Sequence, residues 1–193
     1  MWVTSDGVAV LDHDGKVKVG LRSRPIASVA RGALPDDVPT LEELYAECGT
    51  GFELSLDVKD AAAAEAAAEV ARAAGMEATD RLWLCYPDWE VLTEWRTALD
   101  DVHLVDSTKL RLMRQGPERR AAQLSSAGID AVNLHHTEWS GGLTTLFHRF
   151  GRLAFGWDAQ HERMITELHR MGIDGIYSDH VDRMVDALGL ASG

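Results

Sequence analysis

Short apolar runs alternate with helical patterns from residue 52 onward, and this alternation constrains the fold more than any other feature. Glycines at positions 75, 128, 151 and 172 mark the ends of several of these helices. Repeated strand–helix units of this kind build a parallel sheet, either closed as a barrel or open and doubly wound. The expected strands are 52–59, 81–86, 102–106, 131–135, 152–157 and 175–178, and the expected helices are 60–74, 88–99, 117–127, 141–150 and 160–171.

The first fifty residues follow a different pattern. Residues 3–11 are predicted to form a β-hairpin, because an Asp-Gly turn separates two short apolar runs. Thr40, with Glu43 three residues later, predicts a capping box at the start of a helix over 41–47. Residues 14–38 lie between these two signals and are expected to be an irregular insertion.

Length and charge restrict the possible functions. The 193 residues carry a formal net charge of -12, which argues against non-specific binding of nucleic acid. No linker or repeat divides the chain, so a single domain over 1–193 is expected, although a complete eight-fold barrel usually needs about 250 residues. No run approaches the ~20 apolar residues of a membrane span, and the absence of a signal-like start predicts a cytoplasmic protein. The sequence gives no indication of oligomeric state.

The strand predicted over 52–59 has two different faces. In a barrel, its polar face would point into the interior, and Asp57 and Lys59 would lie at the carboxyl end of the strand, where barrel active sites gather. An edge strand with a solvated polar face is the alternative. The apolar face is Phe52, Leu54, Leu56 and Val58, and the polar face is Glu53, Ser55, Asp57 and Lys59.

Two further positions could contribute to chemistry, and a histidine pair is considered with them. His13 ends an apolar run and precedes Asp14, so it could give a proton to a leaving group, although a surface-loop histidine is the alternative. Trp157 ends a predicted strand and could form the wall of a pocket or lie in the core. His135 and His136 lie at the end of a predicted strand and could rim the site. Adjacent side chains in a strand point to opposite faces, so the two are expected not to chelate a metal and to have no catalytic role.

Several motifs occur in a fixed order along the chain. They are Thr4-Ser5-Asp6-Gly7 followed by His13-Asp14, then Pro39-Thr40-Leu41-Glu42-Glu43-Leu44, then Leu54-Ser55-Leu56-Asp57-Val58-Lys59, then Trp157-Asp158-Ala159-Gln160, and finally 172–179. Taken in this order, they resemble the glycerophosphodiester phosphodiesterase family. The last two resemble the family's seventh strand, which ends Trp-Thr-Val-Asn, and its final strand, Gly-x-Asp-Gly-Ile-x-x-Asp.

The resemblance implies an α/β fold of the (β/α)8 TIM-barrel class, incomplete here. The first strand–helix unit and most of the second strand would be missing, because the family's His-Arg-Gly and Glu-x-Asp motifs would precede Met1. We expect that translation was assigned from an internal valine codon of a GC-rich bacterial gene. A degenerate gene is the rival explanation. In either case, the chain as given is expected to be impaired.

The resemblance also implies roles for particular residues. His13 would be the second catalytic histidine, a general acid. Asp57 would be a ligand of a divalent cation, Mg²⁺ or Ca²⁺, in place of the usual glutamate, and loss of this cation from the shortened chain remains open. Lys59 would face the phosphate, and Trp157 would line the substrate pocket. The implied activity is that of a phosphoric diester hydrolase of lipid metabolism, which converts glycerophosphodiesters to an alcohol and glycerol 3-phosphate. The alternative is a non-catalytic barrel remnant that binds a phosphate ligand or a partner protein.

Overall fold

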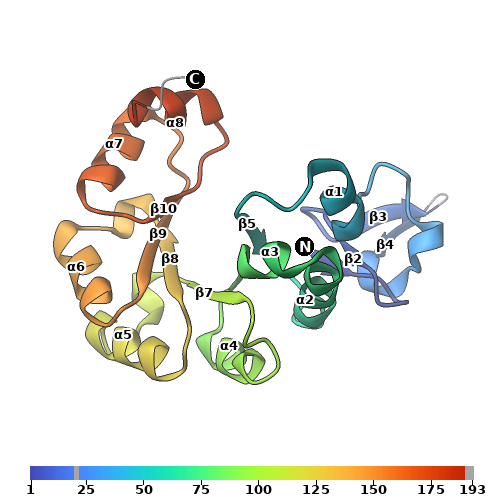
Figure 1. Cartoon of the computed structure of the whole chain (residues 1–193), viewed down its shortest axis with the longest axis horizontal. Coiled ribbons are helices and arrows are strands. Elements are labelled where there is room, and N and C mark those ends of the chain that lie inside the picture. Colours follow the sequence, from blue (N-terminus) through green and yellow to red (C-terminus); the bar gives the residue numbers. More distant parts are fainter. Residues whose placement is uncertain (20–21, 190–193) are drawn as a thin grey trace. The chain divides into compact units, whose positions relative to one another are not determined.

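A computed structural model describes residues 1–19 and 22–189. The chain, predicted to be one domain, divides into two compact units, each described here by itself (Figure 1). The first unit comprises Met1–Tyr86 and Glu94–His103, and the second comprises Pro87–Thr93 and the chain from Leu104 onward.

The predicted hairpin at the start of the chain is confirmed. Strands β1 (Trp2–Val3) and β2 (Ala9–Val10) pair antiparallel, with Trp2 opposite Val10. The turn between them needs a residue with positive φ, and Gly7 supplies it with φ 86°. The Thr4 hydroxyl closes the loop, because it accepts the Val8 N–H at 2.9 Å.

The prediction that 14–38 is irregular is wrong for the residues that the structure describes, while 20 and 21 lie outside them. Strands β3 (Lys16–Val19) and β4 (Arg22–Pro25) form a second antiparallel hairpin, followed by the 3₁₀ helices η1 (Ile26–Ser28) and η2 (Arg31–Ala33). The physical reason is a set of apolar side chains that pack into one core cluster and anchor the segment. The buried members of this cluster are Val10, Val17, Ile26, Val29, Leu34 and Val38.

The rest of the first unit begins the strand–helix repeats. Helix α1 (Leu41–Cys48) opens with the predicted capping box. Helix α2 (Ala63–Ala74) buries a face of small side chains, which lets it approach its neighbours closely. Strands β5 (Leu54–Asp57) and β6 (Leu82–Tyr86) are parallel, with Leu56 opposite Leu84, and the short helix α3 (Met76–Asp80) lies between α2 and β6 in the sequence.

The second unit continues the repeats. The predicted strands and helices are confirmed in place. Strand β8 has its predicted bounds, β7 is shifted by one residue, and the other predicted elements are shorter than their ranges. Strands β7, β8, β9 and β10 are adjacent in that order, and the pairings of β8 with β7 and β9 and of β10 with β9 are parallel. Helix α4 (Trp89–Arg96) and strand β7 (His103–Ser107) have residues in both units. The remaining elements are η3 (Leu110–Leu112), α5 (Pro117–Ser126), β8 (Ala131–His135), η4 (His136–Glu138), α6 (Gly141–Arg149), β9 (Leu153–Trp157), α7 (Glu162–Arg170), β10 (Gly175–Ile176) and α8 (Val181–Ala187).

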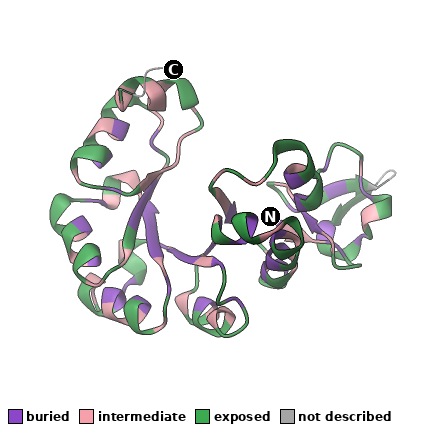
Figure 2. Ribbon diagram, viewed as in Figure 1, coloured by how far each residue is buried: buried purple, intermediate pink, exposed green. Residues whose placement is uncertain are grey.

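The two faces of the sheet formed by β7 to β10 have different surroundings. One face packs against helices: a Cβ on Gly156 would lie 2.9 Å from Leu168 of α7, so only glycine permits this approach. The other face includes Asn133 and Ser107, whose side chains are hydrogen-bonded at 3.2 Å. Figure 2 shows β8 and β9 buried and the outer sides of the helices exposed. No helix within 1–19 and 22–189 is long and apolar enough to cross a membrane.

An ion pair is buried on the helix-facing side. Arg120 of α5 donates to Asp106 of β7 at 2.8 Å, and the side chains are 10% and 0% exposed. Burial raises the pKa of Asp106 to about 6, although the Arg120 guanidinium lowers it in part. The Arg120 guanidinium also lies 5.3 Å from the centre of the Trp89 ring. This network ties α5 to the sheet and to α4.

Candidate functional site

Asp57 and Lys59 lie at the carboxyl end of β5, as the sequence predicts. Leu56 and Val58 alternate with them and are 7% and 1% exposed, whereas the side chains of Asp57 and Lys59 are 60% and 38% exposed. The expected division of this strand into an apolar and a polar face is therefore confirmed. At the other end of the polar face, Glu53 accepts hydrogen bonds from Arg81 at 3.2 Å and Trp83 at 2.7 Å.

Two amino nitrogens contact Asp57 at the end of β5. Lys59 Nζ donates to Asp57 Oδ2 at 2.5 Å, and the amino group of Met1 donates to the carbonyl oxygen of Asp57 at 2.6 Å. Burial lowers the pKa of the Met1 amino group, while the Asp57 carboxylate opposes this shift. The Lys59 ammonium is partly exposed, so an anion such as a phosphate oxygen has access to its charge.

His13 lies in the loop after β2. Its side chain is 94% exposed, and its Nδ1 lies 2.7 Å from Asp14 Oδ1. Neither Asp57 nor Lys59 is a hydrogen-bond partner of His13, so the structure does not bring the predicted acid into contact with the predicted phosphate-binding residues. The loop itself is well fixed, because Asp12 Oδ1 accepts the Gly15 N–H at 2.6 Å.

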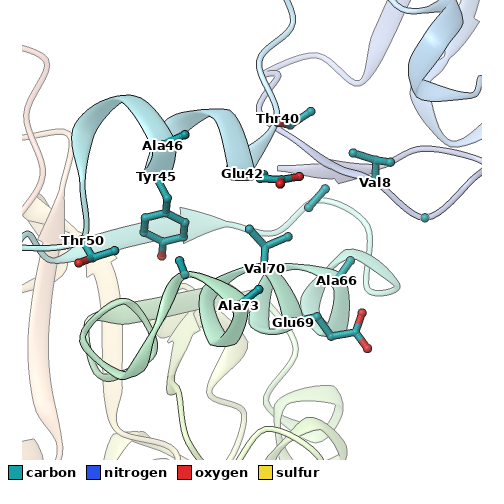
Figure 3. A pocket seen from close by; sticks show the side chains of 13 residues that line it. Val8, Thr40, Glu42, Tyr45, Ala46, Thr50, Ala66, Glu69, Val70 and Ala73 are labelled. Atoms are coloured by element: carbon teal, nitrogen blue, oxygen red, sulfur yellow. The ribbon is translucent and has the colours of Figure 1, made fainter.

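A groove of about 560 Å³ lies between α1 and α2 in the first unit (Figure 3). The Tyr45 ring projects between the helices, facing small side chains of α2 such as Ala73. Burial raises the pKa of the Tyr45 hydroxyl, so it stays protonated at neutral pH. The charged lining residues, Glu42 and Glu69, are both acidic. These two carboxylates disfavour an anionic ligand such as a phosphate in this groove.

A second polar cluster lies where β8 and β9 end. One ligand atom from each of His135, His136 and Asp158 lies within 4.8 Å of the others. The expectation that the two histidines point to opposite faces is wrong. Strand β8 ends at His135 and the 3₁₀ helix η4 begins at His136, so the alternation of side chains stops between them. Their ring centroids are 4.5 Å apart.

His135 and Asp158 have defined hydrogen-bond partners. His135 Nε2 lies 3.1 Å from Asp158 Oδ2, and His135 Nδ1 lies 2.8 Å from Thr137 Oγ1. The side-chain hydrogen bonds from Gln160 and His135 lower the pKa of Asp158, which is therefore ionised. Burial, followed by the charge of His135, lowers the pKa of His136, which favours its neutral form.

Trp157, the fourth predicted site residue, ends β9 beside this cluster. Its ring meets the His135 ring edge to face, with centroids 4.7 Å apart and planes at 83°. The register explains the contact, because His135 is the cross-strand partner of Trp157. Trp157 is half-buried, so part of the ring stays available to a ligand.

The cluster was absent from the sequence predictions, although a signal for it exists. His135 and Asp158 each fall at the carboxyl end of a predicted strand, and adjacent parallel strands end at the same edge of a sheet. Asp158 follows Trp157 directly, but its side chain cannot be oriented from the sequence. It adopts φ 63°, and it is the one non-glycine residue with positive φ in the described part of the chain.

The strand–helix repeats define an α/β protein. Its polar side chains lie at the carboxyl ends of the strands, which is where α/β enzymes place their active sites. The family model described as "Glycerophosphoryl diester phosphodiesterase family" matches residues 2–183. The chain therefore belongs to the glycerophosphoryl diester phosphodiesterase family and is a phosphodiesterase-like enzyme. The resemblance inferred from the sequence motifs is confirmed.

Solved structures with names from this family have the same fold. One from Silicibacter pomeroyi is 20% identical, with a TM-score of 0.80 over 97% of this chain and 80% of its own. One from Galdieria sulphuraria is 16% identical, with a TM-score of 0.78 over 97% of this chain and 83% of its own. A phosphodiesterase from Oleispira antarctica was solved with the product sn-glycerol-3-phosphate. It is 17% identical, with a TM-score of 0.76 over 97% of this chain and 82% of its own. No match was found among curated protein sequences.

Proposed function

We propose that this protein hydrolyses glycerophosphodiesters to an alcohol and glycerol 3-phosphate, a reaction of lipid metabolism. The family match over residues 2–183 supports the reaction class, and the product bound to the Oleispira relative supports the substrate class. The observation that carries the proposal is the exposed pair of Asp57 and Lys59 at the carboxyl end of β5. The finer architecture, a (β/α)8 barrel of which this chain holds only part, stays a prediction.

Lys59 is the phosphate-binding residue of this proposal. Its ammonium is partly exposed, so a phosphodiester oxygen would meet positive charge there. Asp57 holds the lysine side chain in place in the absence of substrate. Trp157 is proposed to contact the substrate through the part of its ring that His135 leaves free.

His13 is proposed as the general acid. The Asp14 carboxylate can accept a hydrogen bond from Nδ1–H of His13, and Nε2–H would then give its proton to the alcohol oxygen as the phosphorus–oxygen bond breaks. The ring is almost fully exposed, so a substrate has access to it. This role predicts that the loss of His13 lowers turnover more than it lowers phosphate affinity.

The family resemblance implies a divalent cation, which would neutralise phosphate charge. Asp57 is proposed as one of its ligands, but Ca²⁺ takes about six to eight oxygen ligands and Mg²⁺ needs octahedral geometry. Asp57 is not part of a group of three potential ligands in the described residues. The residues at the end of β5 therefore do not fit such a cation by themselves. We expect the 193-residue chain to bind Mg²⁺ and Ca²⁺ weakly and to turn over slowly.

The second candidate function is a non-catalytic barrel remnant that binds a phosphate ligand or a partner protein. It is favoured by two observations: Lys59 neutralises the Asp57 carboxylate, and the His13 ring faces solvent. Under this hypothesis, the positive charge at the end of β5 would bind a phosphate monoester without any subsequent chemistry.

The test measures binding and hydrolysis separately. Calorimetry would measure the affinity for glycerol 3-phosphate, and release of glycerol 3-phosphate from glycerophosphocholine, with and without Mg²⁺ or Ca²⁺, would measure activity. Lys59→Ala is expected to weaken both by about tenfold, a loss of roughly 1.4 kcal/mol. Lys18→Ala, which removes an exposed lysine of β3, should change neither.

The outcomes distinguish the two candidates. Hydrolysis that depends on Lys59 supports the enzyme. Binding that depends on Lys59 without hydrolysis under either cation supports the non-catalytic remnant. If neither binding nor hydrolysis changes in Lys59→Ala, the assignment of this strand end as a phosphate site is wrong.

A further inference from the structure

We propose that His135, His136 and Asp158 form a binding site for a divalent transition-metal ion of the Zn²⁺ class. All three residues belong to the second unit, so the inference rests on the geometry of that unit alone. It does not depend on the proposed hydrolysis.

The distances suit a small metal ion. His135 Nε2 and Asp158 Oδ2 are 3.1 Å apart. Two neighbouring ligands of tetrahedral zinc, at bond lengths of about 2.0–2.1 Å, are about 3.3–3.4 Å apart. The third ligand atom, from His136, completes a set in which all atoms lie within 4.8 Å. Small rotations of the side chains would close the set around one ion.

The backbone brings these three side chains together for local reasons. His135 is the last residue of β8 and lies opposite Trp157, the last residue of β9, so Asp158 follows at the same edge. The turn into η4 then places the His136 ring next to the His135 ring, with planes at 37°. Ligands from two strand ends and one 3₁₀ turn are held by rigid elements, which favours a defined geometry.

Outer contacts orient two of the ligands. A metal on His135 Nε2 would place the ring proton on Nδ1, which can donate to Thr137 Oγ1 at 2.8 Å. This would replace the longer bond that Nδ1 now accepts from the Thr137 N–H at 3.3 Å. Asp158 Oδ1 accepts from Gln160 at 3.1 Å, and Gln160 in turn donates to Asp179 at 2.8 Å. The second carboxylate oxygen of Asp158 is thus left directed to His135.

The donor set selects the class of metal. Two imidazoles and one carboxylate suit Zn²⁺, Fe²⁺, Co²⁺ or Ni²⁺, whereas Mg²⁺ and Ca²⁺ prefer sites made entirely of oxygen. Three protein ligands leave at least one position for water or another oxygen ligand, which is the arrangement of catalytic rather than structural zinc sites. His135 and Asp158 are 27% and 46% exposed, so an ion has access from solvent.

The experiment uses the full chain after treatment with a chelator. Zn²⁺ binding is measured by calorimetry, and Co²⁺ binding by its visible absorption, with Mg²⁺ and Ca²⁺ as comparison ions. The test variants are His136→Gln and Asp158→Asn. The matched control is His148→Gln, because His148 also lies against a carboxylate, 2.7 Å from Asp174, but belongs to no three-ligand group in the described residues.

We expect one Zn²⁺ per chain, with each test variant weakening binding at least tenfold and the His148→Gln variant binding like the parent protein. Co²⁺ should give the intense absorption of a site with four or five ligands in the parent and the control, and much less in the test variants. Circular dichroism confirms that each variant is folded. Equal Zn²⁺ affinity in all proteins, or tighter binding of Mg²⁺ than of Zn²⁺ by the parent, would overturn the proposal.

Discussion

The ionisable groups of the two units are held in different ways. In the first unit, Asp57 and Lys59 are paired at the end of β5 with much of each side chain in water. In the second unit, His135 and Asp158 each have a further partner, and the pair of Asp106 and Arg120 is buried. Groups in water can change partner at little cost, whereas groups fixed by neighbours offer a defined geometry. The first arrangement suits an anionic substrate that displaces one partner, and the second suits an ion with strict geometric needs.

The largest expected difference concerns stability. Asp106→Ala leaves the buried Arg120 guanidinium unpaired, which should lower the free energy of unfolding by about 3–5 kcal/mol. Asp57→Ala removes an exposed pair and should cost at most about 1 kcal/mol. Urea unfolding followed by circular dichroism measures both, and similar midpoints for the two variants would contradict the contrast between the units.

The next effect is stabilisation by metal. Zn²⁺ at about 100 times its dissociation constant should stabilise the folded chain by about 2.7 kcal/mol, because it binds only where the three ligands are assembled. Mg²⁺ at the same concentration should leave the melting temperature almost unchanged. The parent and His136→Gln are compared by thermal unfolding. A rise in melting temperature that is equal in both would show that Zn²⁺ binds elsewhere.

A smaller effect is the pH dependence of stability. The folded-state pKa of Asp106, about 6, lies above its ordinary value of 3.8, because burial outweighs the attraction of Arg120 and the nearby Asp88 carboxylate adds to the shift. The folded state therefore holds this proton more tightly than the unfolded state does. The stabilisation is fully present below about pH 4 and is lost as the pH rises through about 6. Urea midpoints at pH 4, 5, 6 and 7 measure this decline, and Asp106→Asn should flatten it. An unchanged slope would assign the effect to other groups.

The smallest expected effects concern helix caps, one in each unit. Thr40 and Glu43 cap α1 reciprocally, with bonds of 3.0 and 2.7 Å, whereas Ser140 caps α6 through a single bond of 3.3 Å to Leu143 N. Thr40→Ala should cost about 1 kcal/mol and Ser140→Ala about 0.5 kcal/mol. Urea midpoints compare them, and a larger loss for Ser140→Ala would reverse the expected order.

Much of the fold could be predicted from the sequence. The period-2 pattern of β5, the glycines after the helices and the Thr40–Glu43 capping signal are all local, and local signals determine where elements begin and end. The hairpin of β3 and β4 was missed because its strands are short and β4 is exposed throughout. Its anchoring depends on packing with Val10, a contact between residues distant in sequence.

The candidate sites also differ in whether local sequence signals or contacts between distant residues determine them. Asp57 and Lys59 were found because their pattern lies within one strand. The cluster at the ends of β8 and β9 depends on where β8 stops, and an error of one residue there reverses the direction of His136. The roles of His13, Asp57, Lys59 and Trp157 stay predictions, which the experiments above address.

The backbone of Asp158 has a consequence for how this sequence can evolve. At φ 63° a side chain meets steric strain, which aspartate tolerates better than most residues and glycine avoids altogether. Selection for thermal robustness alone would thus favour replacing the aspartate. Screens for stabilised variants should select such replacements readily, at the expense of the carboxylate beside His135.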